Sequence, residues 1–240
     1  MKSIFKKLAR KKTITLKCYC TEPQTNILFP IQKAKDFIPT WYKNLPPYKD
    51  GIMPTTRVCP GIRDAHSKGI VIPLWSDLKI TYDNEGRVEV TAPLNTHNKQ
   101  AEVHNPEQWG RQYQGWTHVK ILSPWFIECD DAVPFMMVEP FWFRDDIPEY
   151  RLSPGVLEFK YQHASHGQIF LPPTTGQKVI DMKGSLPFVH LVPLEDVDIN
   201  LEICELDTVS FNRVVHKSHW TWGNIYYKTK KVLEAKEKNK

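Results

Sequence analysis

The chain has 240 residues, a formal net charge of +5, 41% hydrophobic residues and 25% charged residues. A chain of this length can bury a sizeable core, and the composition excludes a disordered or fibrous protein. No stretch approaches the roughly 20 apolar residues that a membrane-spanning helix needs, and no apolar run of signal-peptide length follows the basic N-terminus. The 5 cysteines fit no disulfide framework. We therefore expect a globular, cytoplasmic protein.

Basic side chains gather at both ends of the chain. Residues 2–17 contain seven Lys and Arg side chains and no acidic one, and residues 228–240 contain six Lys against two Glu. Basic ends on a nearly neutral body favour contact with an acidic surface such as nucleic acid, lipid headgroups or an acidic protein. The alternative is that these lysines only keep the two ends solvated.

The 19 prolines divide the chain into short pieces, which is typical of an all-β protein because each proline removes a backbone donor. Residues 13–20 alternate apolar and polar side chains and predict a strand. Residues 26–31 predict a second strand, and residues 38–47 predict an ordered, proline-broken loop. Residues 59–69 predict a short helix with proline at its start and glycine at its end, and a buried strand follows over residues 70–75.

The clearest unit is a hairpin over residues 77–91, in which two alternating strands flank a turn that contains Gly86. Between residues 119 and 204, turn signals recur about every 8 to 12 residues, the spacing of a β-sandwich or barrel. The pattern becomes helical after Asp207. The sequence thus predicts a mainly β fold, an antiparallel β-sandwich or jelly-roll-like domain with a C-terminal α-helix. The expected segments are a basic N-terminal segment, a β-rich domain and a C-terminal basic helix, at residues 1–12, 13–206 and 207–240.

His163 and His166 follow a predicted strand and are the candidates for a metal site. A jelly-roll metalloenzyme binds its metal through two or three His side chains and a carboxylate that point inward from strand ends, and Glu158 would supply the carboxylate. Residues three apart point to opposite faces of a strand, so this pair can bind one metal only from a loop. We expect a solvent-exposed loop and no cofactor here, and an iron oxygenase-like enzyme with bound Fe or Zn is the alternative.

Aromatic and basic side chains cluster in the predicted C-terminal helix. Large, rigid aromatic side chains contribute much of the contact energy in protein interfaces. The sequence contains no nucleophile elbow, no phosphate-binding glycine loop, no dinucleotide fingerprint and no His-Glu-x-x-His motif, so catalytic residues stay unknown. We predict instead that the helix binds a partner through Trp220, Trp222, Tyr226, Tyr227, Lys230 and Lys231.

Two stretches resemble a group of uncharacterised proteins that tailed phages, often marine ones, and some bacteria encode. The first runs from Cys59-Pro-Gly-Ile-Arg-Asp to Trp-Ser-Asp77, and the second from Lys183-Gly-Ser-Leu-Pro-Phe to Leu-Val-Pro193. The resemblance covers about residues 25–200. It implies a viral or bacterial origin. No activity is established for that group, so no residue role carries over.

The absence of a catalytic motif favours a non-enzymatic structural or interaction protein of a phage or bacterium. Such a protein would bind a protein partner, for example a virion component, or a second copy of itself, through aromatic-rich surfaces and its basic termini. This reading places the chain in the host cytoplasm or in the virion. Two alternatives stay open: the metal-dependent enzyme described above, and a nucleic-acid-associated protein that uses the basic termini.

Overall fold

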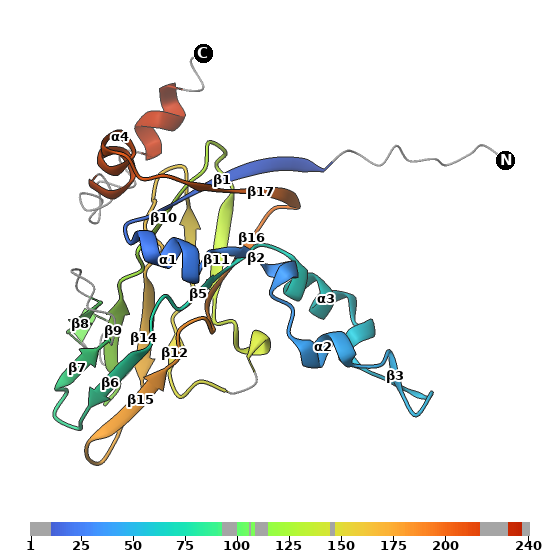
Figure 1. Cartoon of the computed structure of the whole chain (residues 1–240), viewed down its shortest axis with the longest axis horizontal. Helices are drawn as coiled ribbons and strands as arrows, with labels where there is room; N and C mark the ends of the chain where they lie inside the picture. Colours follow the sequence, from blue (N-terminus) through green and yellow to red (C-terminus); the bar gives the residue numbers. More distant parts are fainter. Residues whose placement is uncertain are drawn as a thin grey trace.

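The structure is a computed structural model that describes residues 11–92, 100–105, 107–108, 115–144, 147–216 and 230–236. Within these residues the chain is mainly β, as the sequence predicts, with four sheets of three to five strands and one small two-stranded hairpin. Figure 1 shows a central body from which two projections extend downward. No helix among the described residues is long and apolar enough to cross a membrane.

The first sheet places β1 (Lys12–Cys20) between β10 (Trp125–Glu128) and β17 (Val197–Cys204). β1 is antiparallel to β10, but it is parallel to β17, and these two strands run side by side across the top of Figure 1. Nearly the whole chain separates β1 from β17, so no tight turn forces them to be antiparallel. The predicted antiparallel sheets are confirmed, and this parallel pair is an addition to them.

The largest sheet has five strands, and all its neighbours are antiparallel. Two of its inner strands are buried along nearly their whole length, which explains their almost continuous apolar sequences. In order across the sheet, the strands are β13 (Gly155–Glu158), β11 (Pro134–Val138), β16 (Pro187–Pro193), β5 (Ile70–Pro73) and β2 (Gln32–Lys33).

Two smaller sheets complete the body. The first contains, in order, β12 (Arg151–Leu152), β14 (Gly167–Leu171), β9 (Thr117–Ile121) and β8 (Ala101–His104). The second contains β15 (Lys178–Met182), β6 (Leu78–Tyr82) and β7 (Val88–Thr91), and it forms the lower left projection in Figure 1. The hairpin predicted over residues 77–91 is confirmed as β6 and β7. Its turn is fixed by Asp83, whose Oδ1 accepts the backbone N–H groups of Glu85 and Arg87.

One hydrophobic core joins the four sheets, since each sheet contributes buried side chains to it. Each large ring removed from water stabilises the fold by about 1.5–3 kcal/mol. The sequence left open whether the tryptophans are core or surface residues. Trp75 and Trp125 are buried in the core, whereas Trp41 is exposed. The fully buried rings include Trp75, Trp125, Phe135, Phe159 and Phe188.

The two stretches that carry the phage resemblance lie against each other. Residues 59–77 contain α3 (Pro60–Ser67) and β5, and residues 183–193 contain β16, which pairs with β5. Gly69 permits this close approach, because its φ is +86° and a Cβ there would collide with the backbone oxygen of Leu191. The two stretches therefore form one structural unit through the pairing of β5 with β16.

Residues 34–69 form the lower right projection in Figure 1, and we call them the arm. The predicted helix over residues 59–69 is confirmed as α3, whereas the expected loop over residues 38–47 contains a helix of its own. The elements of the arm are η1 (Ala34–Asp36), α2 (Thr40–Asn44), β3 (Tyr48–Lys49), β4 (Met53–Pro54), η2 (Thr56–Val58) and α3.

The strand expected over residues 26–31 is wrong. Its first half belongs to α1 (Pro23–Leu28), which ends beside Phe29, and only the two residues of β2 join a sheet. Pro23 explains the difference, because its fixed φ suits the first turn of a helix, where no backbone donor is needed. A short apolar run does not by itself distinguish a strand from a helix.

The C-terminal part is helical where the structure describes it. α4 (Thr208–Ser210) continues into the π-helical turn η5 (Phe211–His216), and residues 230–236 form a further helical turn. Asp207 caps α4, because its Oδ1 accepts the backbone N–H of Ser210 at 2.7 Å. The helix predicted near the C-terminus is confirmed as short segments. Residues 217–229 and 237–240 of that prediction, and residues 1–10 of the basic N-terminal segment, lie outside the described residues.

Candidate functional site

The three residues considered as candidates for a metal site lie at the end of β13 and between β13 and β14. His163 Nδ1 donates to a backbone oxygen of β10 at 3.0 Å, and burial lowers the pKa of its ring. The ring of His166 packs edge-on against a phenylalanine of β10, with centroids 6.2 Å apart. Glu158 forms an ion pair with Lys230. Each of the three candidates is thus held by a different neighbour.

Potential metal ligands do not gather elsewhere in the described part of the chain. It contains no group of three or more His, Cys, Asp and Glu side chains that could hold a metal ion. Burial raises the pKa of the Cys18 thiol, and it raises the pKa of Cys20 to about 11. Thiols in this environment stay protonated near neutral pH and are poor ligands and nucleophiles. The metal-enzyme alternative therefore finds no ligand set among the described residues.

Arg213 of η5 connects this helical turn to the first sheet through two polar contacts. Its Nε lies 2.8 Å from Glu128 Oε1, and its Nη2 donates to the hydroxyl oxygen of Tyr19 at 2.9 Å. Beside this polar contact, Val214 and Val215 are buried in a small apolar cluster that includes the Tyr19 ring. The sequence left open whether this segment docks on its own body or on a partner, and η5 docks on its own body.

The structure describes two of the six residues predicted to bind a partner, Lys230 and Lys231. Lys230 forms the ion pair with Glu158 and lies 5.7 Å from the centre of the Tyr161 ring, so its charge is engaged within the chain. Lys231 is exposed. The partner-binding role of the set stays a prediction. The members that lie outside the described residues are Trp220, Trp222, Tyr226 and Tyr227.

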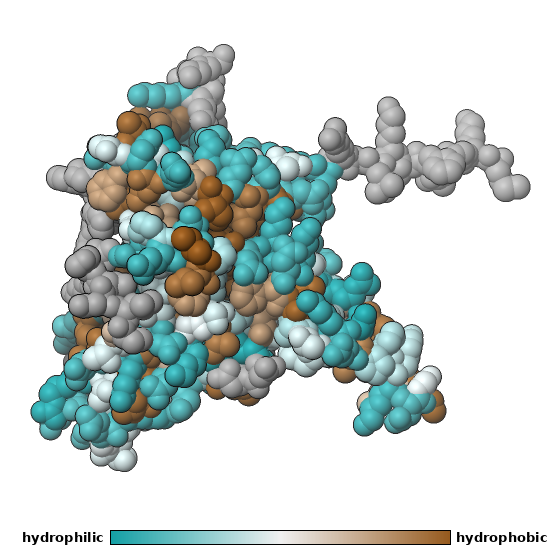
Figure 2. Space-filling view, viewed as in Figure 1, coloured by the Kyte–Doolittle hydropathy of each residue, from teal (hydrophilic) through white to brown (hydrophobic). Residues whose placement is uncertain are grey.

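The tip of the arm, formed by β3, β4 and the turn between them, exposes three large apolar side chains. Tyr48, Ile52 and Met53 are 52%, 85% and 56% exposed. Asp50 and Gly51 turn the chain with φ angles of 52° and 71°, a left-handed conformation that Asp and Gly tolerate well. Figure 2 shows this end of the arm at the lower right, where hydrophobic brown lies next to hydrophilic teal and away from the body. These side chains contribute little to folding and are available for contact.

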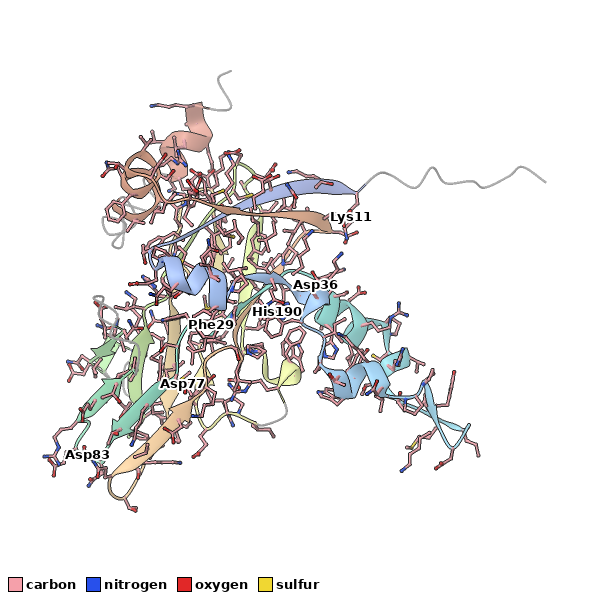
Figure 3. All side chains as sticks on the ribbon, in the orientation of Figure 1. Lys11, Phe29, Asp36, Asp77, Asp83 and His190 are labelled. Atoms are coloured by element: carbon pink, nitrogen blue, oxygen red, sulfur yellow. The ribbon has the colours of Figure 1, made fainter. Side chains whose placement is uncertain are left out.

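Aromatic rings surround two buried histidines where the arm meets the body. His66 of α3 packs edge-on against the Tyr42 ring, with centroids 4.3 Å apart, and lies 5.5 Å from the Phe143 ring. His190 of β16, labelled in Figure 3, lies 5.3 Å from the same Phe143 ring. Burial lowers the pKa of both histidines, that of His190 to about 4. Both rings are therefore neutral near pH 7.

The hydrogen bonds of these two histidines are incomplete. His190 Nε2 donates to the backbone oxygen of Lys68 at 2.8 Å, which leaves its Nδ1 as an unprotonated acceptor. Nδ1 of His190 and Nδ1 of His66 are both buried, and neither has a hydrogen-bond partner among the described residues. Buried polar atoms without a partner cost stability and are uncommon in native proteins.

A pocket of about 640 Å³ opens beside this cluster, between α2, η2 and α3. The rings of Tyr42 and His66 form one part of its wall, and aliphatic side chains form another. Its volume lies within the range of small-molecule sites, about 300–1,000 Å³. The charged residues that line it are Lys43, Arg57, Arg63 and Asp64.

A second pair of histidines lies on one face of the four-stranded sheet. His104 of β8 and His118 of β9 are directly opposite each other, with ring centroids 4.8 Å apart. The His118 ring stacks on Phe170 at 4.9 Å, and its Nε2 lies 2.6 Å from Gln168 Oε1. Because cross-strand pairs of this kind stabilise sheets, these contacts give His118 a structural role.

Neither the tip of the arm nor its root, where His66 and His190 contact the Phe143 ring, was predicted from the sequence. The dipeptide Asp50-Gly51 between apolar residues is a hairpin signal, and it would have located the tip. No local pattern joins His66 to His190, because they come from elements far apart in the sequence. Only the fold brings them together.

No protein-family model, no curated protein and no solved structure matches this chain.

Proposed function

We propose that this chain is a non-enzymatic interaction protein of a phage or bacterium, and that the arm binds an acidic protein partner through its tip. The observation that carries the proposal is the exposure of Tyr48, Ile52 and Met53 together at the end of a projection. Single exposed apolar residues are ordinary, whereas a cluster of them indicates a contact surface. Burying one such side chain against a partner stabilises the complex by about 1.5–3 kcal/mol.

The charge of the arm indicates the chemistry of the partner. Residues 34–69 contain six Lys and Arg side chains, three Asp and no Glu. Lys49 lies within the tip itself and is exposed. An apolar centre with a charged rim is the usual anatomy of a protein interface, and positive charge steers an acidic partner toward it. The partner that fits is a protein with an apolar recess surrounded by acidic side chains.

The C-terminal residues supply a second contact in this proposal. Lys231 is exposed, and with the four C-terminal aromatic residues predicted from the sequence it would form this second contact. The phage resemblance supports a virion component as the partner, met in the host cytoplasm or in the virion.

Site-specific photo-crosslinking in the organism that encodes the chain tests the proposal. The crosslinking amino acid replaces Ile52 at the tip, and in a matched control it replaces Glu85, which is exposed in the turn of the other projection. We expect one acidic protein to be captured from position 52 and not from position 85. The complex of the purified proteins should weaken with rising salt, because the charges that steer it are exposed.

Three outcomes would contradict the proposal. The first is equal capture of the same protein from both positions, which would mean that the tip has no special role. The second is capture of nucleic acid from position 52, which would favour the nucleic-acid alternative. The third is turnover of a small molecule by the chain with its arm tip substituted, which would favour an enzyme.

A further inference from the structure

We propose that the pocket at the root of the arm binds a small organic anion, namely a carboxylate or phosphate group carried on an apolar body. The pocket is distinct from the tip, because Tyr48, Ile52 and Met53 do not line it. It therefore extends the function of the arm beyond protein binding, and it can be tested without the partner.

Two cations of the pocket are free to meet an anion. The side chains of Lys43 and Arg63 form no hydrogen bond or ion pair with any described residue, although both line the pocket. Arg57 is fixed at the same wall, because its Nη1 donates to the backbone oxygens of Lys43 and Leu45, the latter at 3.0 Å. A rigid guanidinium with free N–H groups is well suited to bind a carboxylate or phosphate.

The single acidic residue of the lining does not cancel this charge. Asp64 Oδ2 lies 3.1 Å from Nζ of Lys68, the residue that follows α3, so it already has a cationic partner. Three cations with one neutralised carboxylate give the pocket a positive potential. A positive, partly enclosed wall concentrates anions and excludes cations.

The rest of the wall indicates that the anion has an apolar body. Ile38, Pro47 and Val58 line the pocket together with the ring of Tyr42. Sites for small molecules combine such apolar walls with a few polar groups that fix the orientation of the ligand. A small inorganic anion would leave these side chains in water, whereas an aromatic or aliphatic acid would cover them.

His66 supplies the second, independent sign of a ligand. Its ring lines the pocket but is only 2% exposed, and its Nδ1 has no partner among the described residues. Folding alone thus buries a polar ring without completing its hydrogen bonds, which costs stability. A ligand that enters the pocket and reorients the ring would compensate that cost.

Titration of the full-length chain with three small probes tests the proposal. Phenyl phosphate and phenylacetate represent the two sources of negative charge, and 2-phenylethanol is the uncharged control. Binding is measured by calorimetry, and the NMR signals of the His66 ring report whether the probe reaches the pocket. We expect at least one acid to bind with a Kd below about 1 mM and to shift the His66 signals, and 2-phenylethanol to bind at least ~10-fold more weakly.

Matched substitutions locate the site. Arg63→Gln and Lys43→Gln remove one pocket cation each, and Lys49→Gln removes a cation of the arm that does not line the pocket. Either pocket substitution should weaken binding by ~10-fold or more, and Lys49→Gln should change it less than about twofold. All three substituted residues are exposed, so melting temperatures should stay similar to that of the parent chain.

The proposal is overturned if neither acid binds at about 10 mM, or if the uncharged control binds as tightly as the acids. It is also overturned if the acids bind but the two pocket substitutions leave the affinity unchanged. Preference for phenyl phosphate over phenylacetate, or the reverse, identifies which anionic group the pocket takes. Ile52→Ser should not alter binding of either acid, so this result is separable from any failure of the partner proposal.

Discussion

Acidification should destabilise the arm root through His190, and the size of the effect follows from the structure. In an unfolded chain, histidine binds a proton near pH 6.5. In the folded chain, burial lowers the pKa of His190 to about 4. His66 is the titratable neighbour that contributes to this shift, and the rings of Phe143 and Trp142 pack on the other sides.

The sign and the magnitude can be worked out from these two pKa values. Above about pH 6.5 neither state protonates His190, so the residue adds no pH dependence. As the pH falls, the unfolded state binds the proton first, so the free energy of unfolding decreases until the folded state is also protonated near pH 4. At about 1.4 kcal/mol per unit of pKa difference, protonation of His190 lowers the free energy of unfolding by about 3 kcal/mol between pH 6.5 and pH 4.

Urea unfolding of the parent chain and of His190→Gln, at about pH 7 and about pH 4.5, measures this loss. Glutamine has an N–H donor that can replace the bond to Lys68 but does not titrate. We expect the loss of stability on acidification to be smaller in His190→Gln by about 2–3 kcal/mol. Equal losses in the parent chain and in His190→Gln would refute the reasoning.

Three further substitutions test separate parts of the fold. Gly69→Ala should reduce the free energy of unfolding, measured by urea titration, by more than ~3 kcal/mol, because a Cβ at this position collides with the backbone of β16. A loss under ~1 kcal/mol would contradict the close approach of the two backbones. Tyr82→Phe should cost about 1 kcal/mol, because the hydroxyl donates to the Pro172 oxygen at 3.0 Å. Arg213→Met should speed amide hydrogen exchange in η5 by ~10-fold or more and leave the exchange rates of the core strands unchanged. Unchanged exchange rates in η5 would contradict the role of Arg213 in holding this segment on the first sheet.

The hairpin of β6 and β7 was predictable because all its determinants are local. Alternation fixes which side chains face the core, and Asp83 supplies the turn through its own carboxylate. The helix α3 was predictable for the same reason, since Pro60 suits its first turn and Gly69 follows its end. Local chemistry therefore accounts for these elements.

Long-range pairing was not predictable from one sequence. β1 pairs with β17 through residues that are 185 positions apart, as with Thr15 and Asn200. No sequence pattern in either strand identifies the other as its partner. The cluster at the root of the arm was not predictable for the same reason, because His66, Phe143 and His190 come from three segments far apart in the sequence. The two-residue strands β3 and β4 are too short to show a strand period, so only the turn signal Asp50-Gly51 could have located the tip.

His163, His166 and Glu158 were the alternative that composition offered for a metal site, and the described residues hold no group of three or more potential ligands. His163 and His166 are near in sequence, yet each contacts β10 with a different group. Glu158 forms an ion pair with Lys230, which neutralises its negative charge. Sequence proximity alone does not show which neighbour each side chain will contact.

The affinity of the crosslinked partner for arm-tip variants tests the central claim most directly. Ile52→Ser and Met53→Ser remove exposed apolar contacts from the tip, and Leu194→Ser removes a residue of similar exposure, 53%, from a bend outside the arm. We predict that each tip substitution raises the Kd by ~10-fold or more while the melting temperature stays the same, and that Leu194→Ser leaves the Kd unchanged. Equal affinity for the parent chain and both tip variants would contradict the claim that the arm is the binding element.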